Sequence, residues 1–352
     1  MTTLDAILGP WPAQTALFGI STLGVVGMGL AILLGGVGLL YAALPWIAQP
    51  LLRVVLTLRY NLRVVGLENV PRTGPVLLVS NHLSWFDGFF LAGTIPRKGT
   101  ALVNVGTFRQ PILGLLSRRC GLIPVPNSGP KAQRASIVAC QKALDDSLLL
   151  GIFPEGQLSR TGMTAAFHRG LEVILRDRPG VVVVPVYLDN VWGSIMSFSG
   201  GLFFKKWPKG LRRTVVISYG PPVAPPINVF RVRQAVLASG VAARAALGFT
   251  PERPEPIDPA LPHFDDPKLG PLTASTADVD EPQFALHQIG QKPGTIGHPL
   301  PGVAIRAVDD SGGELPEDAE GKLQALVPGR AGWAEIGHRG KVARDGFVTL
   351  TD

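Results

Sequence analysis

The chain has 352 residues, enough for two domains and for at least one sizeable hydrophobic core. Its two cysteines, Cys120 and Cys140, exclude a disulfide framework and a cysteine-based metal site, and they indicate free thiols in a reducing compartment. The net charge of +7 conceals an asymmetry, because residues 1–250 carry 24 basic against 9 acidic side chains and residues 251–352 carry 9 against 17. No basic–aromatic nucleic-acid module is visible, so we expect an anionic membrane surface as the partner and no nucleic acid.

The N-terminal segment, residues 1–50, predicts a membrane helix. No charged residue lies between Asp5 and Arg53, and the apolar part, about residues 15–44, exceeds the ~20 residues that a spanning helix needs. The segment is too long and too weakly basic at its start for a cleaved signal peptide. Because arginines follow it, the body of the protein is predicted on the cytoplasmic face. The expected arrangement is single-pass; a monotopic hairpin that turns at Gly35-Gly36 is the alternative.

Residues 51–250 alternate between strand-like and helix-like stretches, which predicts an α/β fold with a mostly parallel sheet flanked by helices. The strand-like runs are 59–65, 76–80, 101–105, 122–125, 149–153, 181–188 and 214–219. The helical stretches are 86–92, 108–118, 130–147, 166–176 and 229–247. Basic and aromatic residues between 203 and 213 also predict an interfacial patch that docks on lipid headgroups.

The stretch Asn81-His82-Leu83-Ser84-Trp85-Phe86-Asp87 follows a buried strand and precedes a helix, where ligands bind in open α/β sheets. A carboxylate five residues from His82 can fold back onto the imidazole, fix one tautomer and stabilise the imidazolium. That arrangement suits a general base that activates an alcohol. A Ser–His–Asp hydrolase is disfavoured because Ser84 lies two positions from His82 and no Gly-x-Ser-x-Gly elbow occurs.

Two further motifs follow: Phe153-Pro154-Glu155-Gly156 after an apolar run, and the valine run that leads into Pro185-Val186. Together, and in this order, the three motifs resemble those of the glycerolipid acyltransferases, the lysophosphatidic acid acyltransferase group, over roughly residues 55–225. The resemblance implies transfer of an acyl group from acyl-CoA or acyl-carrier protein, as co-substrate, to a glycerol hydroxyl of a membrane lipid. It implies His82 as the base, Asp87 as its support, and neither a metal nor a bound cofactor.

The same resemblance implies an acceptor site shaped by the second motif, with a basic side chain on the phosphate. This sequence departs from the family at that point, because Gln157 follows Glu155-Gly156. The stretch 122–127 also holds no basic residue, and Lys131 comes only later. The predicted substrate-binding residues are Asn81, Ser84, Phe153, Pro154, Glu155, Gly156, Arg160, Lys131 and Arg169.

The last hundred residues predict a Pro-rich linker over 251–285 and a small β-rich fragment over 286–352. Lys292-Pro293-Gly294-Thr295-Ile296-Gly297-His298 and Asp345-Gly346-Phe347-Val348 resemble part of an adenylate-forming, acyl-activating domain. The resemblance covers only about residues 270–352 and lacks that family's phosphate loop and catalytic lysine. We therefore expect that this region does not adenylate a substrate.

An acyltransferase followed by an adenylating module resembles the bacterial bifunctional acyl-carrier-protein synthetase/2-acylglycerophosphoethanolamine acyltransferases. That pairing favours a lysophospholipid acceptor over lysophosphatidic acid. The alternative function is a catalytically inactive, membrane-anchored remnant that binds lipid or a carrier protein.

Overall fold

The computed structural model describes residues 22–126, 129–200, 212–254, 258–281 and 286–352, with side chains from Val26 onward. The first residues of the expected membrane helix (15–21), most of the expected interfacial patch (203–211) and parts of the expected linker (255–257 and 282–285) lie outside the described residues. The chain divides into two compact units, Met1–Ala48 and Gln49–Asp352.

Helix α1 (Thr22–Arg59) is continuous across Gly35-Gly36, so the hairpin alternative is not the arrangement in this structure. The helix also continues through Pro45 and Pro50 to Arg59, beyond the end near residue 44 that the sequence predicts. A proline in a helix interior removes one hydrogen bond and favours a kink, and α1 stays helical across both prolines. In the described part of the chain, α1 is the one helix long and apolar enough to cross a membrane.

The last turns of α1 belong to the second unit and pack against α2 (Asp87–Thr94). Gln49 Nε2 donates to the carbonyl oxygens of Ala92 and Ile95 at 3.1 and 3.0 Å, and Arg53 Nε donates to the carbonyl oxygen of Gly93 at 2.8 Å. A Cβ atom on Gly93 would lie 2.7 Å from Leu56 Cδ1, so the absence of a side chain permits this close approach.

A seven-stranded sheet forms the centre of the second unit, in the order β1-β7-β6-β2-β5-β3-β4. All neighbouring strands are parallel except the pair β6–β7. The predicted α/β class with a mostly parallel sheet is therefore confirmed. The strands are β1 (Tyr60–Val65), β2 (Val76–Ser80), β3 (Gly99–Asn104), β4 (Ile123–Val125), β5 (Leu149–Ile152), β6 (Val182–Asp189) and β7 (Arg213–Tyr219).

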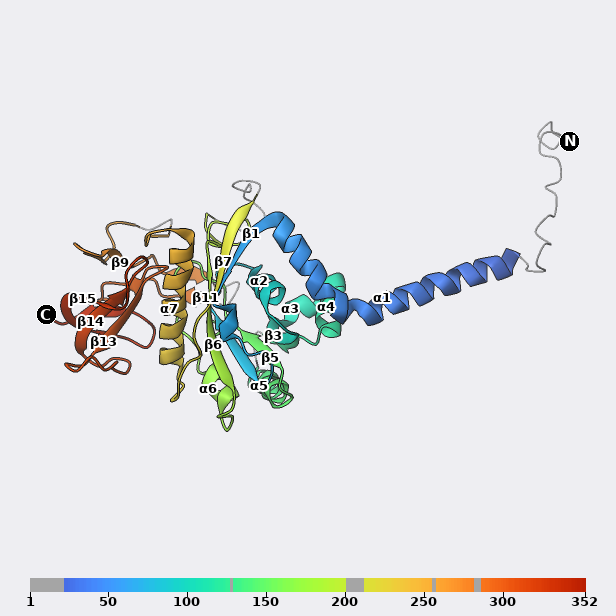
Figure 1. Cartoon of the computed structure of the whole chain (residues 1–352), viewed down its shortest axis with the longest axis horizontal. Helices are drawn as coiled ribbons and strands as arrows, with labels where there is room; N and C mark the ends of the chain where they lie inside the picture. Colours follow the sequence, from blue (N-terminus) through green and yellow to red (C-terminus); the bar gives the residue numbers. More distant parts are fainter. Residues whose placement is uncertain (1–21, 127–128, 201–211, 255–257, 282–285) are drawn as a thin grey trace, which may run out of the picture. The chain divides into compact units, whose positions relative to one another are not determined.

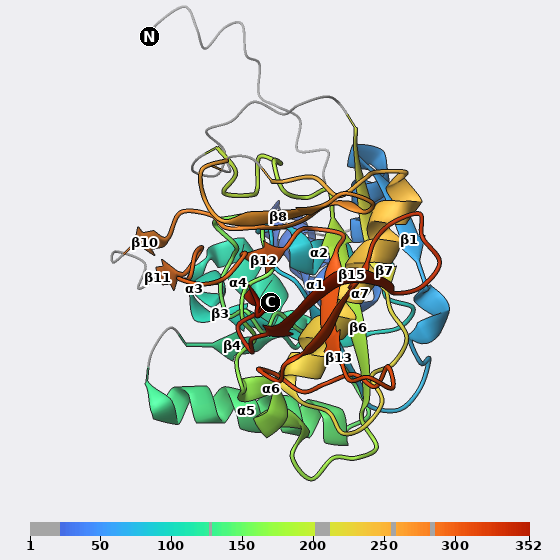
Figure 2. The ribbon, with the colours of Figure 1, turned by 90° about the vertical axis from the view of Figure 1, so that its left-hand side faces the viewer.

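Alternating side chains of the central strands enter two different hydrophobic cores, because successive residues of a strand point to opposite faces. On β2, Leu77 and Val79 enter the core beneath α5, α6 and α7, whereas Val76 and Leu78 enter the core beneath α2 and the end of α1. Figure 2 shows α5 and α6 side by side. The remaining helices are η1 (Leu67–Asn69), α3 (Val105–Arg109), α4 (Pro111–Arg119), α5 (Pro130–Asp145), α6 (Gly170–Leu175) and α7 (Val229–Leu247).

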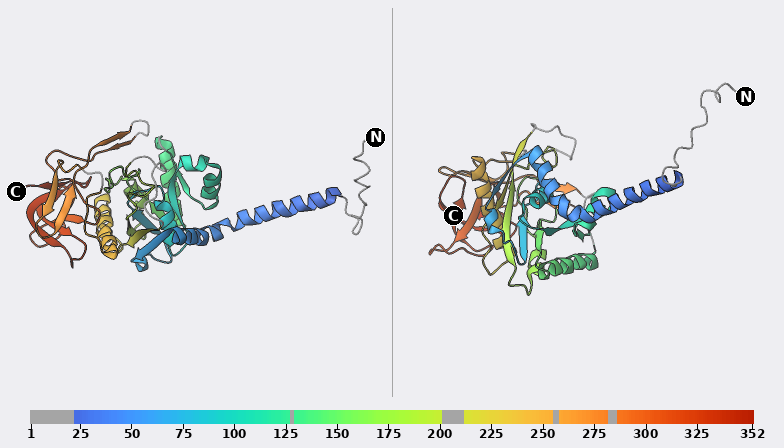
Figure 3. Two further views of the ribbon diagram at one scale, coloured as in Figure 1. Left: turned by 90° about the horizontal axis from the view of Figure 1, so that it is seen from above. Right: turned by 45° about the vertical axis from the view of Figure 1, so that its right-hand side comes forward.

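The strands between residues 263 and 350 form a C-terminal β region that packs on α7. Helix α7 lies between the central sheet and strands β13–β15 (Figure 1). Both views of Figure 3 show the same layering, with the golden helix between the green and red strands. Gln234 Nε2 on α7 donates to the carbonyl oxygen of Ile305 at 2.8 Å, and Met163 and Phe230 join the hydrophobic core of the β region. The β region therefore shares its core with the preceding residues.

The expected Pro-rich linker over 251–285 contains three strands, which is a correction to the sequence-based assignment. Five of its eight prolines precede the first strand, and the later residues include Leu272 and Ala274, which are fully buried. The strands of the C-terminal β region are β8 (His263–Asp266), β9 (Gly270–Ala274), β10 (Val279–Glu281), β11 (Leu286–Gln288), β12 (His298–Pro299), β13 (Ala304–Val308), β14 (Gly321–Leu326), β15 (Ala334–Val342) and β16 (Val348–Leu350).

Candidate active site

The His82 loop begins at the carboxyl end of β2 and is attached to the neighbouring strand β6 by Asn81. The Asn81 side chain is fully buried; its Nδ2 donates to the carbonyl oxygen of Leu188 at 3.1 Å, and its Oδ1 accepts from the Leu188 N–H at 2.8 Å. Both amide atoms are therefore used by the backbone of β6. In this structure Asn81, a predicted substrate-binding residue, anchors the loop that carries His82.

His82 and Asp87 form the predicted pair, with 2.9 Å between Nδ1 and Oδ2. Asp87 is fully buried, and its Oδ2 also accepts from the N–H groups of Leu83 and Ser84 at 2.6 and 2.8 Å. Because an ionised carboxylate only accepts hydrogen bonds, His82 Nδ1 is the donor, which leaves Nε2 as the proton acceptor. The His82 side chain is 21% exposed.

Ser84 is buried, and its hydroxyl donates to Asp87 Oδ1. The hydroxyl therefore orients the carboxylate of Asp87 and is not directed at the imidazole of His82, as a hydrolase nucleophile requires. This contact gives Ser84, another predicted substrate-binding residue, a position behind the His82–Asp87 pair.

The Phe153–Gly156 motif, at the end of β5, meets the His82 loop across the sheet edge. The ring of Phe153 stacks on the imidazole of His82, with centroids 4.0 Å apart and an angle of 13° between the planes. Glu155 Oε1 accepts from the His82 N–H at 2.8 Å, and Ser159 N–H donates to the His82 carbonyl oxygen at 2.9 Å. Parallel strands end at one edge, so motifs 73 residues apart in the chain form a single site.

Glu155 is almost fully buried and holds two loops together. Its Oε2 accepts from the Ala165 N–H at 2.9 Å, while Pro154 accepts from the His168 N–H at 2.9 Å through its carbonyl oxygen. Burial raises the pKa of Glu155 to about 8, against the opposing effects of the Ala165 and His82 N–H groups and of Arg233. Within this structure Glu155 contacts the backbone of the site.

The buried guanidinium of Arg233 supports the same loop from α7. It donates from Nε to the carbonyl oxygen of Ala165 at 3.1 Å and from Nη2 to that of Thr164 at 2.8 Å. Burial lowers its pKa to about 10, an effect that Glu155 opposes. No sequence motif pointed to Arg233, since only the fold brings α7 against residues 164–165.

The three basic residues predicted to grip a phosphate are not brought together. Lys131 is exposed in the first turn of α5. The side chain of Arg160 is 9% exposed; it forms an ion pair with Glu281 at 2.9 Å and lies over the ring of Phe198. Arg169 is exposed directly before α6, at the edge of a cavity.

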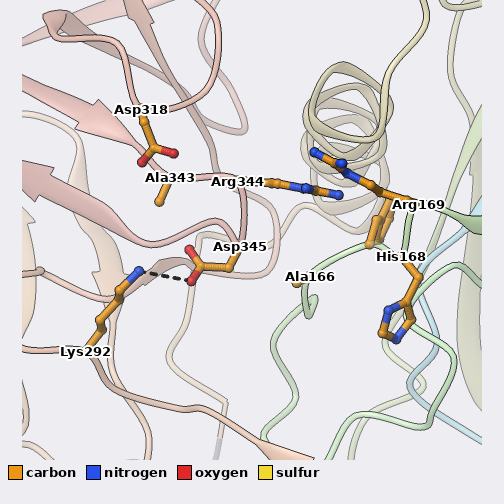
Figure 4. Close-up of a pocket in the computed structure, with 9 residues that line it drawn as sticks. Ala166, His168, Arg169, Lys292, Asp318, Ala343, Arg344 and Asp345 are labelled. Atoms are coloured by element: carbon orange, nitrogen blue, oxygen red, sulfur yellow. Dashed lines mark hydrogen bonds and ion pairs between the residues drawn. The ribbon is translucent and has the colours of Figure 1, made fainter. Parts of the chain in front are cut away.

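That cavity, of about 550 Å³, lies between residues 166–169 and the C-terminal β region (Figure 4). The helix that the sequence predicts from residue 166 begins only at Gly170, which leaves Ala166–Arg169 as a loop that lines the cavity. The loop adjoins the second motif, because a Cβ atom on Gly156 would lie 3.0 Å from His168 Cδ2. The cavity residues from the β region, which sequence reasoning missed, are Lys292, Asp318, Ala343, Arg344 and Asp345.

Within the described residues, no group of three His, Cys, Asp or Glu side chains could hold a metal ion.

Residues 61–189, which include the His82 and Glu155 motifs, match the family model described as Acyltransferase. This part of the chain is therefore similar to the acyltransferase family. A chloroplastic 1-acyl-sn-glycerol-3-phosphate acyltransferase of Arabidopsis thaliana is 30% identical over 138 residues, which is 39% of this chain. The chain spans only 38% of the length of that relative. The predicted resemblance to glycerolipid acyltransferases is confirmed for this domain.

Two solved structures have lower similarity. The 1-acyl-sn-glycerophosphate acyltransferase from Thermotoga maritima is 20% identical, with a TM-score of 0.46 over 56% of this chain and 78% of its own. The adenylation domain of a keto acid-selecting NRPS module is 17% identical, with a TM-score of 0.20 over 34% of this chain and 27% of its own. Both scores are too low to establish a shared fold, so the resemblance of the C-terminal residues to adenylate-forming domains stays a prediction.

Proposed function

We propose that the protein is an O-acyltransferase that moves a fatty acyl group from a thioester to the free glycerol hydroxyl of a lysophospholipid. The observation that carries the proposal is the His82–Asp87 pair, in which Nδ1 is bound to a buried carboxylate and Nε2 is left to accept a proton. Lysophosphatidic acid is the first candidate acceptor, because the matched relative is named for acylation of 1-acyl-sn-glycerol-3-phosphate. Acyl-CoA and acyl-carrier protein are the candidate donors.

In the proposed reaction, His82 Nε2 takes the proton of the acceptor hydroxyl while its oxygen attacks the thioester carbonyl. Asp87 stabilises the imidazolium that forms. The tetrahedral intermediate then collapses; the carbon–sulfur bond breaks, and the thiolate leaves and takes the proton back from His82. The products are an ester and a free thiol. No covalent acyl-enzyme is required, because the thioester is already activated.

The test is acyl transfer by the detergent-purified full chain, supplied with labelled acyl-CoA or acyl-carrier protein. The acceptors are lysophosphatidic acid, lysophosphatidylethanolamine and the matched diacyl lipids, which lack the free hydroxyl. We expect a labelled diacyl product and an equal amount of free thiol with the lyso lipids only. No transfer with any pair, from protein shown to be folded, would contradict the proposal and support the alternative, an inactive lipid- or carrier-binding remnant.

We further propose that α1 anchors the protein in the membrane as a single span, with the acyltransferase domain on the cytoplasmic face. Its apolar side chains from Val26 to Leu40 are exposed, and the first positive charges follow at Arg53 and Arg59. The orientation is tested by labelling single cysteines placed before Thr22 and after Arg63 with a membrane-impermeant reagent.

A variant that begins at Gln49 is expected to keep its fold and lose membrane association. The hydrogen bonds of Gln49 and Arg53 lie within the second unit and are retained, whereas the apolar span is removed. Circular dichroism and sedimentation with anionic lipid vesicles measure the two properties, with the full chain as control. Vesicle binding as tight as that of the full chain would show that another surface anchors the protein.

A further inference from the structure

We propose that the C-terminal β region completes a phosphate-binding cavity of the acyltransferase domain. His168 and Arg169 contribute from the acyltransferase domain, and Arg344 and Lys292 contribute from the β region. The ligand is a phosphate monoester carried by a substrate, so the proposal rests on the proposed function for the identity of that substrate. It assigns the C-terminal β region a role in substrate binding in place of adenylation.

The cavity is built from two distant parts of the chain. The loop Ala166–Arg169 forms one wall, and the turn Ala343–Asp345, between β15 and β16, forms the opposite wall. Figure 4 shows the side chains of Arg169 and Arg344 extending toward one another from the two walls. At about 550 Å³, the cavity has the size of pockets that hold small ligands.

The Lys and Arg side chains that line the cavity outnumber its acids by one, because Arg169, Lys292 and Arg344 face only Asp318 and Asp345. Lys292 is paired with Asp345 at 3.2 Å, and Arg344 has only a distant acidic neighbour, Glu317, at 3.9 Å. No described residue forms a hydrogen bond or ion pair with the side chain of Arg169 or His168. The one remaining acid on the cavity wall is Asp318.

Two guanidinium groups directed at one another repel unless an anion lies between them. A phosphate monoester supplies up to two negative charges and three acceptor oxygens, which match the forked donors of two arginines. Inorganic phosphate, the headgroup of lysophosphatidic acid and the 3′-phosphate of coenzyme A share this chemistry. The cavity is therefore suited to a terminal phosphate and less suited to a phosphodiester.

Arg160, the basic residue nearest the second motif in sequence, already forms an ion pair within the protein. This pairing favours the cavity as the phosphate site. Arg160 is held by Glu281 of β10, and its backbone N–H donates to Gln288 of β11 at 2.7 Å. Residues of β10 and β11 thus bind Arg160 of the acyltransferase domain, and the turn between β15 and β16 contributes Arg344 to the cavity. The His168 N–H donates to the carbonyl oxygen of Pro154, so the cavity adjoins the loop whose Phe153 stacks on His82.

The test measures equilibrium binding to full-length protein that carries His82→Ala, so that no turnover occurs. Arg344→Gln and Arg169→Gln are compared with Arg339→Gln, a matched control on β15 whose exposed side chain has acidic neighbours at 3.8 and 3.9 Å outside the cavity. The ligand pairs are lysophosphatidic acid against monoacylglycerol, and coenzyme A against 3′-dephospho-coenzyme A. Inorganic phosphate is the competitor.

We expect each cavity variant to weaken binding of the phosphate-bearing member of one pair by roughly tenfold. Binding of the member without that phosphate is expected to be unchanged. A loss confined to lysophosphatidic acid identifies the acceptor headgroup as the ligand, and one confined to coenzyme A identifies the donor. A loss confined to competition by inorganic phosphate would identify a site for free phosphate and would overturn the assignment to a substrate-borne phosphate monoester. Using variants on both walls guards against a folding defect in either one.

The proposal is overturned if Arg344→Gln and Arg169→Gln bind every phosphate compound as tightly as Arg339→Gln. It is also overturned if the parent protein binds no phosphate compound. Binding that depends on Arg344 in a protein that transfers no acyl group would contradict the proposed function alone. Acyl transfer that is unaffected by Arg344→Gln would contradict the proposed phosphate cavity but not the proposed function.

Discussion

Replacing His82 by alanine is expected to lower kcat for acyl transfer by roughly 10³-fold or more, since a positioned general base contributes about 10² to 10⁴. The imidazole lies at the end of β2, stacked on Phe153 and held by Asp87. KM is expected to change little, because the base acts on the hydroxyl proton in the transition state. Steady-state kinetics with the preferred donor and acceptor measures both constants.

The matched control is His263→Ala, which removes an exposed histidine on β8 and is expected to leave kcat unchanged. A His82→Ala protein that retains the parent kcat would show that the central motif is not catalytic. A variant that has lost both kcat and its near-ultraviolet circular dichroism would instead indicate unfolding. For that reason, kinetics and spectra are recorded on the same preparations.

Glu155→Gln is expected to change the pH dependence of stability more than any other single substitution at the site. Burial raises the pKa of Glu155 from 4.5 to about 8, so the folded protein retains a proton that the unfolded chain releases in that interval. The free energy of unfolding of the parent therefore falls as pH rises from 4.5 to 8, by up to about 1.4 kcal/mol per pH unit from this group. Because glutamine does not titrate, the free energy of unfolding of the variant lacks this decline with pH.

The measurement is urea unfolding of parent and variant at pH 5, 6, 7 and 8. We expect the variant to gain stability relative to the parent as pH rises, by roughly 3 kcal/mol across the range. Burial lowers the pKa of His298 to about 3, so this residue makes the free energy of unfolding rise with pH below pH 6.5. Parent and variant share this contribution, and it cancels in the difference between their free energies of unfolding. A constant difference from pH 5 to 8 would contradict the raised pKa of Glu155.

The same variant is expected to lose part of its activity. The two oxygens of Glu155 accept from the N–H groups of His82 and Ala165, and the single oxygen of glutamine can serve only one of them. One loop is then released, and the backbone that positions the imidazole loosens. The carboxyl group of Glu155 lowers the free energy of unfolding at neutral pH, but it holds the backbone of His82 and Ala165 in place for catalysis.

Local sequence patterns were sufficient for most of the fold. Apolar runs of four to eight residues predicted the central strands, and the helix over 229–247 has the predicted bounds. The spacing of His82 and Asp87 was also decisive, since five residues across a strand–helix turn allow the carboxylate to reach Nδ1. These features depend on contacts between residues that are close in the chain.

What the charged side chains do was decided only by the tertiary structure. Arg160 follows the second motif in sequence, but its partner, Glu281, is 121 residues away, and no local pattern specifies that ion pair. Leu272 and Ala274 lie in a segment that its prolines mark as a linker, yet burial against the C-terminal core makes it a strand. Arg169 and Arg344 line one cavity because α7 and the β region pack together. Periodicity and motif spacing report short-range geometry, whereas the partner of a charge depends on which distant surfaces the sheet and its helices bring into contact.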